Sequence, residues 1–141
     1  MIFNRERAKQ LIDFEGLNYG KILPTDIDGL IEYHGIAVIF YEFKYGNAEM
    51  PYGQRLAIER IVDAIAESGK HAVAFLCKHY IADPNEDVQA KDAIVTQTYY
   101  DGGWYDCHDT VKNKTTKYLD YIRRNYELSG HSEGQRRNQD Y

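Results

Sequence analysis

The 141-residue chain has few of the features that would place it outside the ordinary globular proteins. Its two cysteines, Cys77 and Cys107, are too few for a disulfide framework and favour a reducing compartment. No apolar run approaches the roughly 20 residues that cross a bilayer. The N-terminus is charged from Arg5 onward and has no apolar segment of the kind found in secretory signals. We therefore expect a cytoplasmic protein that has no membrane partner.

The sequence also has no internal repeat, no low-complexity block and no linker rich in proline or glycine. A chain of this length can bury a core of its own without metals or disulfides. We therefore expect one domain over residues 1–128. Residues 129–141 contain no aliphatic side chain, so we expect them to form a flexible tail.

The net charge of −5 argues against the broad basic surface that dominates the affinity of many nucleic-acid-binding proteins. A local basic stripe remains compatible with this balance. The last predicted helix carries such a stripe, made of Lys112, Lys114, Lys117, Arg123 and Arg124. It has two readings of equal weight: a face that follows a phosphate backbone, or an ordinary solvated helix.

Hydrophobic periodicity predicts an α/β protein. Helices are expected at residues 3–14, 53–67 and 110–126, and strands at residues 26–33, 36–44, 71–78 and 93–100. The short turn at His34 and Gly35 predicts that the first two strands form an antiparallel hairpin. The order α, β, β, α, β, β, α predicts a mixed sheet flanked by helices.

Charged residues interrupt the strongest strand of the chain, residues 36–44. Glu42 and Lys44 share one face of this strand, because side chains alternate along it. Asp28 lies on the preceding strand and faces the same pocket if the two strands pair in the right register. Two such carboxylates can hold one Mg²⁺ or Mn²⁺ ion. The simpler alternative is a Glu–Lys pair at a solvated sheet edge, with Asp28 in a turn.

This pattern resembles the core of the PD-(D/E)XK nuclease superfamily, which includes restriction endonucleases, Holliday-junction resolvases and phage exonucleases. The resemblance covers residues 1 to about 80. It rests on Pro24 and the residues that follow it through Ile31, on Glu42-Phe43-Lys44, and on Gly53-Gln54 at the start of a helix. The family shares an αβββαβ core, whereas two strands are predicted here before the middle helix. The resemblance implies a restriction-endonuclease-like fold.

Carried over residue by residue, the resemblance makes Asp28 and Glu42 metal ligands and Lys44 the catalytic lysine. Gln54 corresponds to a helix-borne glutamine that supports the site. The proline–aspartate signature is imperfect, because Pro24 precedes Asp28 by four positions and Asp26 by two. Asp26 is therefore a candidate to assist the metal or to cap a turn.

An acidic residue of the first helix often joins the metal shell in this superfamily. In this chain the candidates are Glu15, Asp13 and Glu6, and Glu15 is the one we carry forward. The cofactor implied is Mg²⁺ or Mn²⁺.

The resemblance implies a metal-dependent nuclease, a phosphodiesterase that acts on nucleic acid, with DNA preferred to RNA. Small members of such families often act as homodimers. The alternative is a catalytically silent binding or inhibitory protein that keeps the nuclease fold and acts through a protein partner. A phage-encoded inhibitor is one form of this alternative, and the acidic balance of the chain favours it.

Overall fold

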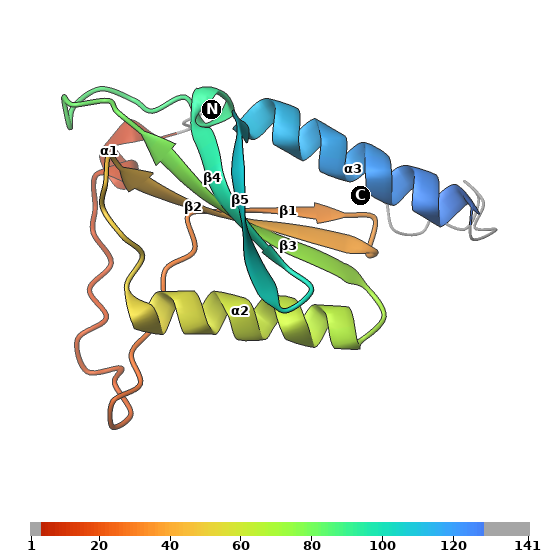
Figure 1. Cartoon of the computed structure of the whole chain (residues 1–141). Helices are drawn as coiled ribbons and strands as arrows, with labels where there is room; N and C mark the ends of the chain where they lie inside the picture. The colour runs from red at the N-terminus through yellow and green to blue at the C-terminus, as the bar shows by residue number, and fades with distance from the viewer. Residues whose placement is uncertain (1–3, 129–141) are drawn as a thin grey trace.

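The computed structural model describes residues 4–128, which form a five-stranded sheet with one long helix on each face (Figure 1). The predicted tail, residues 129–141, lies outside the described residues. The elements in chain order are α1 (Arg5–Ala8), β1 (Gly29–Tyr33), β2 (Ala37–Tyr45), α2 (Tyr52–Glu67), β3 (His71–His79), the 3₁₀ helix η1 (Ala90–Asp92), β4 (Ile94–Tyr100), β5 (Gly103–Thr110) and α3 (Val111–Leu128).

The strands follow one another across the sheet in the order β1-β2-β3-β4-β5. β2 and β3 run parallel, and α2 makes the crossover between them, whereas every other neighbouring pair is antiparallel. The predicted α/β class, with a mixed sheet flanked by helices, is therefore confirmed. Within residues 4–128, no helix combines the length and the apolar composition needed to cross a membrane.

The predicted hairpin between the first two strands is confirmed. His34 and Gly35 have φ angles of 50° and 70°, and Ile36 N donates to Tyr33 O at 2.9 Å. Three residues, His34, Gly35 and Ile36, separate the paired Tyr33 and Ala37, and the two positive φ angles reverse the chain within this short loop. This turn sets the register in which Gly29 pairs with Tyr41. β1 begins at Gly29 rather than at residue 26, so the aspartates of the predicted motif lie just before it.

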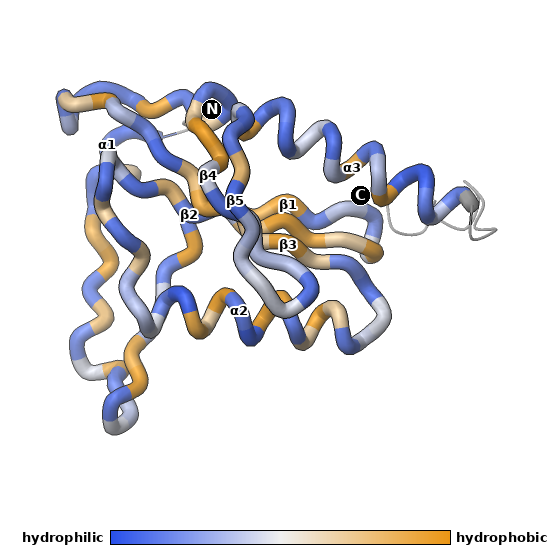
Figure 2. Tube along the Cα trace, in the orientation of Figure 1, coloured by the Kyte–Doolittle hydropathy of each residue, from blue (hydrophilic) through white to orange (hydrophobic). Residues whose placement is uncertain are grey.

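Alternation along β2 divides the core into two layers. Ile39 and Tyr41 pack toward α3, in a cluster that includes Phe75 of β3. Phe40 packs toward α2, in a cluster with Ile58 and Val62. Figure 2 shows the resulting concentration of hydrophobic residues along the central strands. We call the two sides of the sheet the α2 face and the α3 face.

The predicted helix over residues 3–14 is wrong for most of its length, because α1 spans only four residues, Arg5–Ala8. Leu11 and Ile12, two large apolar residues of the predicted range, are 94% and 74% exposed. A helix of this length is marginal in water unless its apolar side packs against something. α2 and α3 already cover the two faces of the sheet, and the chain from residue 9 to residue 28 runs outside this core (Figure 1).

The prediction of four strands is also wrong, because β5 follows β4 through a second tight turn. Asp101 and Gly102 have φ angles of 49° and 76°, and the turn that they form reverses the chain into a further strand. β5 is the last strand of the sheet, and much of it is polar and exposed, including Asp106 and His108. An edge strand of this composition lacks the apolar alternation by which strands are recognised in a sequence.

Candidate active site

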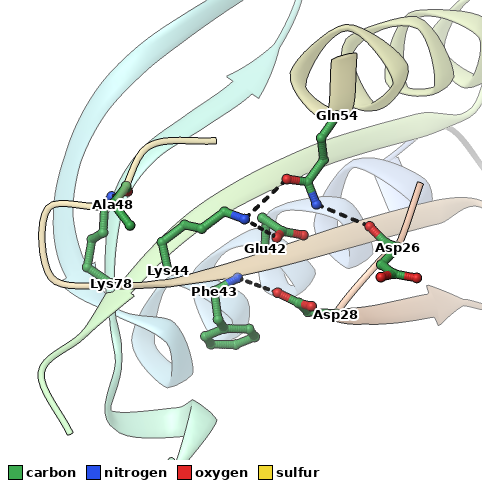
Figure 3. Close-up of polar contacts among 8 residues, drawn as sticks. All are labelled: Asp26, Asp28, Glu42, Phe43, Lys44, Ala48, Gln54 and Lys78. Carbon is green, nitrogen blue, oxygen red and sulfur yellow. Dashed lines mark hydrogen bonds and ion pairs between the residues drawn. The ribbon is translucent and has the colours of Figure 1, made fainter. Parts of the chain in front are cut away.

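Glu42 and Lys44 lie near the C-terminal end of β2 on the α2 face (Figure 3). Glu42 is only 4% exposed, since it follows the buried Phe40 on the same face of the strand. Lys44 Nζ lies 3.0 Å from Glu42 Oε1, and the lysine side chain is 20% exposed. The same ammonium donates to Gln54 Oε1 at 3.2 Å. The predicted pairing of acid and lysine on one face is therefore observed.

Gln54 connects the site to two other parts of the chain. It lies in the first turn of α2, so the start of this helix brings its amide over the end of β2. Its Oε1 accepts from Lys44, and its Nε2 donates to the backbone oxygen of Asp26 at 3.2 Å. One amide therefore holds the lysine in place and also fixes the chain that leads into β1 (Figure 3).

Asp28 lies directly before β1. Continuing the register that pairs Gly29 with Tyr41 places Asp28 opposite Glu42, and directly opposed residues point to the same face of an antiparallel pair. Asp28 Oδ2 accepts a hydrogen bond from the backbone N–H of Phe43 at 2.8 Å. The carboxylate is thus fixed against the edge of β2 beside Glu42.

Glu42 is in an environment that disfavours its charge. Burial raises its pKa above the usual value, and the negative charge of Asp28 raises it further. The hydrogen bond from Lys44 is the largest opposing influence, and Gln54 also lowers this pKa. Within residues 4–128, Glu42 Oε2 is the one buried side-chain nitrogen or oxygen atom that has no hydrogen-bond partner. A buried oxygen without a partner typically costs about 1–3 kcal/mol, so the site is incomplete as an all-protein arrangement.

These features fit a hard divalent cation. Carboxylate oxygens are the ligands that Mg²⁺ prefers, and Mg²⁺ commonly uses one or two protein carboxylates while keeping several waters. The unpartnered Oε2 of Glu42 and the carboxylate of Asp28 are a donor pair of this kind. Among residues 4–128 there is no group of three or more His, Cys, Asp or Glu side chains arranged to hold a metal ion. A larger protein cage is therefore absent from the described part of the chain.

The structure does not bring the other predicted ligands into this cluster. Asp26 contributes its backbone oxygen, which accepts from Gln54. Glu15 lies in the exposed chain before β1, where its N–H donates to Asp13 Oδ1 at 2.9 Å. Glu6 lies within α1 and pairs with Lys9 at 3.3 Å on the surface. Glu6 is thus paired with a lysine on the surface of α1, while Asp13 and Glu15 lie beyond the end of this short helix.

Lys78 is a neighbour of the site that the sequence did not reveal. It is the register partner of Lys44 on β3, so the two lysines lie side by side on the α2 face. Its ammonium donates to the backbone oxygen of Ala48 and anchors the loop between β2 and α2 (Figure 3). A lysine near the end of a buried strand, two residues after Leu76, was the available signal, but only the parallel pairing of β2 and β3 places it here.

The chain matches no family model, no curated protein and no solved structure. The fold and the site therefore define a class in physical terms only, an α/β domain with a buried acid–lysine cluster at the end of a central strand. The assignment of a function rests on the arrangement of Asp28, Glu42, Lys44 and Gln54.

Proposed function

We propose that this chain is a restriction-endonuclease-like, Mg²⁺- or Mn²⁺-dependent nuclease that hydrolyses phosphodiester bonds in nucleic acid. The observation that carries the proposal is the buried carboxylate of Glu42. It has one oxygen without a partner, an ammonium on its other oxygen and a second carboxylate opposite. A purely structural role gives no reason for a glutamate at a position where burial raises the pKa of its carboxyl group.

Each residue has a defined role in the proposed reaction. Asp28 and Glu42 would hold the cation, whose charge lowers the pKa of a bound water and stabilises negative charge on the phosphate. Lys44 would donate a hydrogen bond to the attacking water or to a phosphate oxygen, since its ammonium is already held at the cluster. Gln54 is a positioning residue, because it acts through Lys44 and through the chain at Asp26.

A catalytically silent protein that binds a partner is the second candidate function, and a separate observation favours it. The chain between α1 and β1, which we call the N-terminal segment (residues 9–28), exposes many large apolar side chains. They are Leu11, Ile12, Phe14, Leu17, Tyr19, Ile22, Leu23 and Ile27. Exposed apolar surface of this extent is typical of protein–protein contact sites. Contact with a protein partner would account for the exposed apolar side chains of this segment, but it would not account for the buried carboxylate of Glu42.

The proposal is tested with plasmid, single-stranded and branched DNA, and with single-stranded RNA, in Mg²⁺, Mn²⁺ or EDTA. We expect cleavage of at least one substrate with either cation and none in EDTA. Lys44→Ala should lower the rate by about 100-fold or more, as is usual when a group that positions or transfers a proton is lost. The matched control is Lys91→Ala, which removes an exposed lysine from η1.

Two outcomes contradict the proposed nuclease. One is a wild-type protein that cleaves none of these substrates with either cation. The other is cleavage that Lys44→Ala leaves at the wild-type rate while the variant remains folded, because the activity would then belong to another group or to a contaminant.

A further inference from the structure

A hollow of about 560 Å³ lies at the start of β3, on the side of the sheet that α3 covers. Its floor includes Val73 and Phe75, which belong to the α3-face core. Its walls come from three distant parts of the chain: the end of α2 with the start of β3, the turn after β4, and α3. None of its lining residues belongs to the cluster of Asp28, Glu42, Lys44 and Gln54, which we call the Glu42 cluster. This cluster lies near the opposite end of β2, on the α2 face. We call this hollow the α3 pocket.

The α3 pocket concentrates positive charge in an acidic protein. Lys70, Lys114 and Lys117 line it together with His71, and Asp101 is the one acidic residue of the lining. Lys117 is partly neutralised, because its Nζ lies 2.8 Å from Asp109 Oδ2. Neither Lys70 nor Lys114 forms an ion pair with another residue of the 4–128 range. The fold thus places two free ammonium groups from separate segments around one concavity, which favours an anionic ligand.

Aromatic side chains surround the same hollow. Tyr100 and Tyr121 are 47% and 55% exposed, and Tyr118 is partly buried against the core. Exposed aromatic rings beside positive charges are the elements with which proteins stack nucleobases and track phosphates. The volume falls within the roughly 300–1,000 Å³ of typical small-molecule sites. A ligand that combines a flat aromatic ring with a phosphate satisfies both parts of this lining.

A second hollow is less suited to an anion. It lies beside Lys78 and the loop between β2 and α2, and it measures about 590 Å³. Its cations, Arg55 and Lys78, are matched in number by Glu49 and Asp106. Arg55 is also engaged already, since its guanidinium stacks on Trp104 at 4.6 Å. Of these two hollows, only the α3 pocket has an excess of positive charge.

We infer that the α3 pocket is a nucleotide-binding site separate from the proposed active site. Lys70 and Lys114 contact the phosphate, and Tyr100 or Tyr121 stacks on the base. The nucleotide comes either from a free mononucleotide or from one unit of a nucleic-acid strand. Both sources present the same phosphate and base.

The test measures binding in EDTA, where the proposed cleavage does not occur. Adenosine 5′-monophosphate and a 5′-phosphorylated deoxyadenosine hexamer are the two probes, measured by calorimetry and fluorescence anisotropy, with inorganic phosphate and adenosine for comparison. We expect the variant Lys70→Gln/Lys114→Gln to bind the nucleotide probes at least tenfold more weakly than wild type. Tyr121→Leu should weaken them several-fold without the loss of a charge. The matched control, Lys112→Gln, removes an exposed lysine of α3 that lies outside the pocket and should bind like wild type.

The two probes separate the two sources. Comparable affinity for the monophosphate and the hexamer identifies a free-nucleotide site, whereas at least tenfold tighter binding of the hexamer identifies a strand. The inference is overturned if neither probe binds at millimolar concentration, if inorganic phosphate binds as well as the monophosphate, or if Lys112→Gln loses as much affinity as the double variant. Binding is measured in EDTA and its loss is assigned to Lys70→Gln/Lys114→Gln, whereas cleavage is measured with the cation and its loss is assigned to Lys44→Ala, so failure of the proposed nuclease activity and failure of this site are distinguishable.

Discussion

Glu42 is buried because the strand that carries it is buried, and the consequence is a carboxylate that is costly to ionise. Its neighbours on the α2 face of β2 and β3 are Phe40 and Leu76, which offer no hydrogen bonds to it. Lys44 is the main group that favours the charged form, while Asp28 opposes it. The ionisation of Glu42 therefore affects both the pH dependence of stability and the ability of the site to hold a cation.

Lys44→Met should make the stability of the protein depend more strongly on pH. Loss of the ammonium removes the largest influence that lowers the pKa of Glu42, so this pKa rises further. An acid whose pKa is raised in the folded state holds more protons there than in the unfolded chain. The free energy of unfolding therefore falls as the pH rises from the ordinary pKa of glutamate through the raised value, and it is highest below that range. Each tenfold increase in the proton affinity of folded Glu42 adds about 1.4 kcal/mol to this fall.

The measurement is urea denaturation of wild type and Lys44→Met at pH 5 and pH 8 without divalent cations. Lys91→Met serves as the control for loss of an exposed lysine. Equal pH dependence in all three proteins would show that Lys44 does not govern the ionisation of Glu42.

The sequence predicted that Asp28, Glu42 and Lys44 would lie close together, but it did not predict the hydrogen bonds among their side chains. Strand alternation is enough to place Glu42 and Lys44 on one face, and the short hairpin is enough to bring Asp28 opposite. The unpartnered oxygen of Glu42 depends on the side-chain rotamers and on the position of Gln54, which the packing of α2 determines. The expectation that a first helix would present Glu15 to the site was wrong. The sequence does not show that α2 and α3 already cover both faces of the sheet, so that such a helix has no face to pack against.

The β1–β2 hairpin is the element that positions the two acids. Its short turn at residues 34–36 fixes the register, and a shift of one residue would move Asp28 to the other face of the sheet. The positive φ of Gly35 is a conformation that a side chain disfavours.

Gly35→Ala should lower the free energy of unfolding by about 1–2 kcal/mol, the usual cost of a left-handed conformation for a residue with a Cβ. Gly53→Ala is the matched control in the first turn of α2, where φ is ordinary and an added Cβ meets nothing within 4 Å. That substitution should instead raise the free energy of unfolding, by up to about 1 kcal/mol. Thermal and urea denaturation check both signs, and a Gly35→Ala protein as stable as wild type would show that the turn does not constrain the hairpin.

Most elements were predictable because their apolar patterns agree with their surroundings. β2, β3 and α2 each bury side chains at the expected period, so their bounds were predicted to within one or two residues. β5 and α1 could not be predicted in the same way. β5 is a polar edge strand whose existence depends on pairing with β4, and the N-terminal segment has a helical pattern but no surface to pack on.

At the scale of the whole molecule, residues 4–128 combine a compact sheet covered by the two long helices, α2 and α3, with an N-terminal segment that lies outside the core. Residues 4–28 contribute no buried side chain. Figure 2 shows hydrophobic positions along this segment, away from the core that the strands and helices form.

A chain that begins at Pro24 should therefore keep the fold. Its free energy of unfolding should lie within about 0.5 kcal/mol of the full chain, the range expected when only surface residues are lost. Pro24 is chosen as the start because it retains the Asp26 oxygen that Gln54 contacts. Urea denaturation and circular dichroism check this expectation. A shortened chain that unfolds or aggregates would show that the N-terminal segment covers part of the core.

The account as a whole depends on Asp28 and Glu42 holding one cation between them. The most direct measurement is a crystal structure of the wild-type protein soaked in Mn²⁺, with the ion located by its anomalous scattering. We predict one ion within about 2.0–2.2 Å of an oxygen of each carboxylate, the range expected for small divalent cations, and no ion at this position in crystals of Glu42→Gln. Wild-type crystals in which Mn²⁺ is absent from the cluster, or contacts only one of the two acids, would contradict the account.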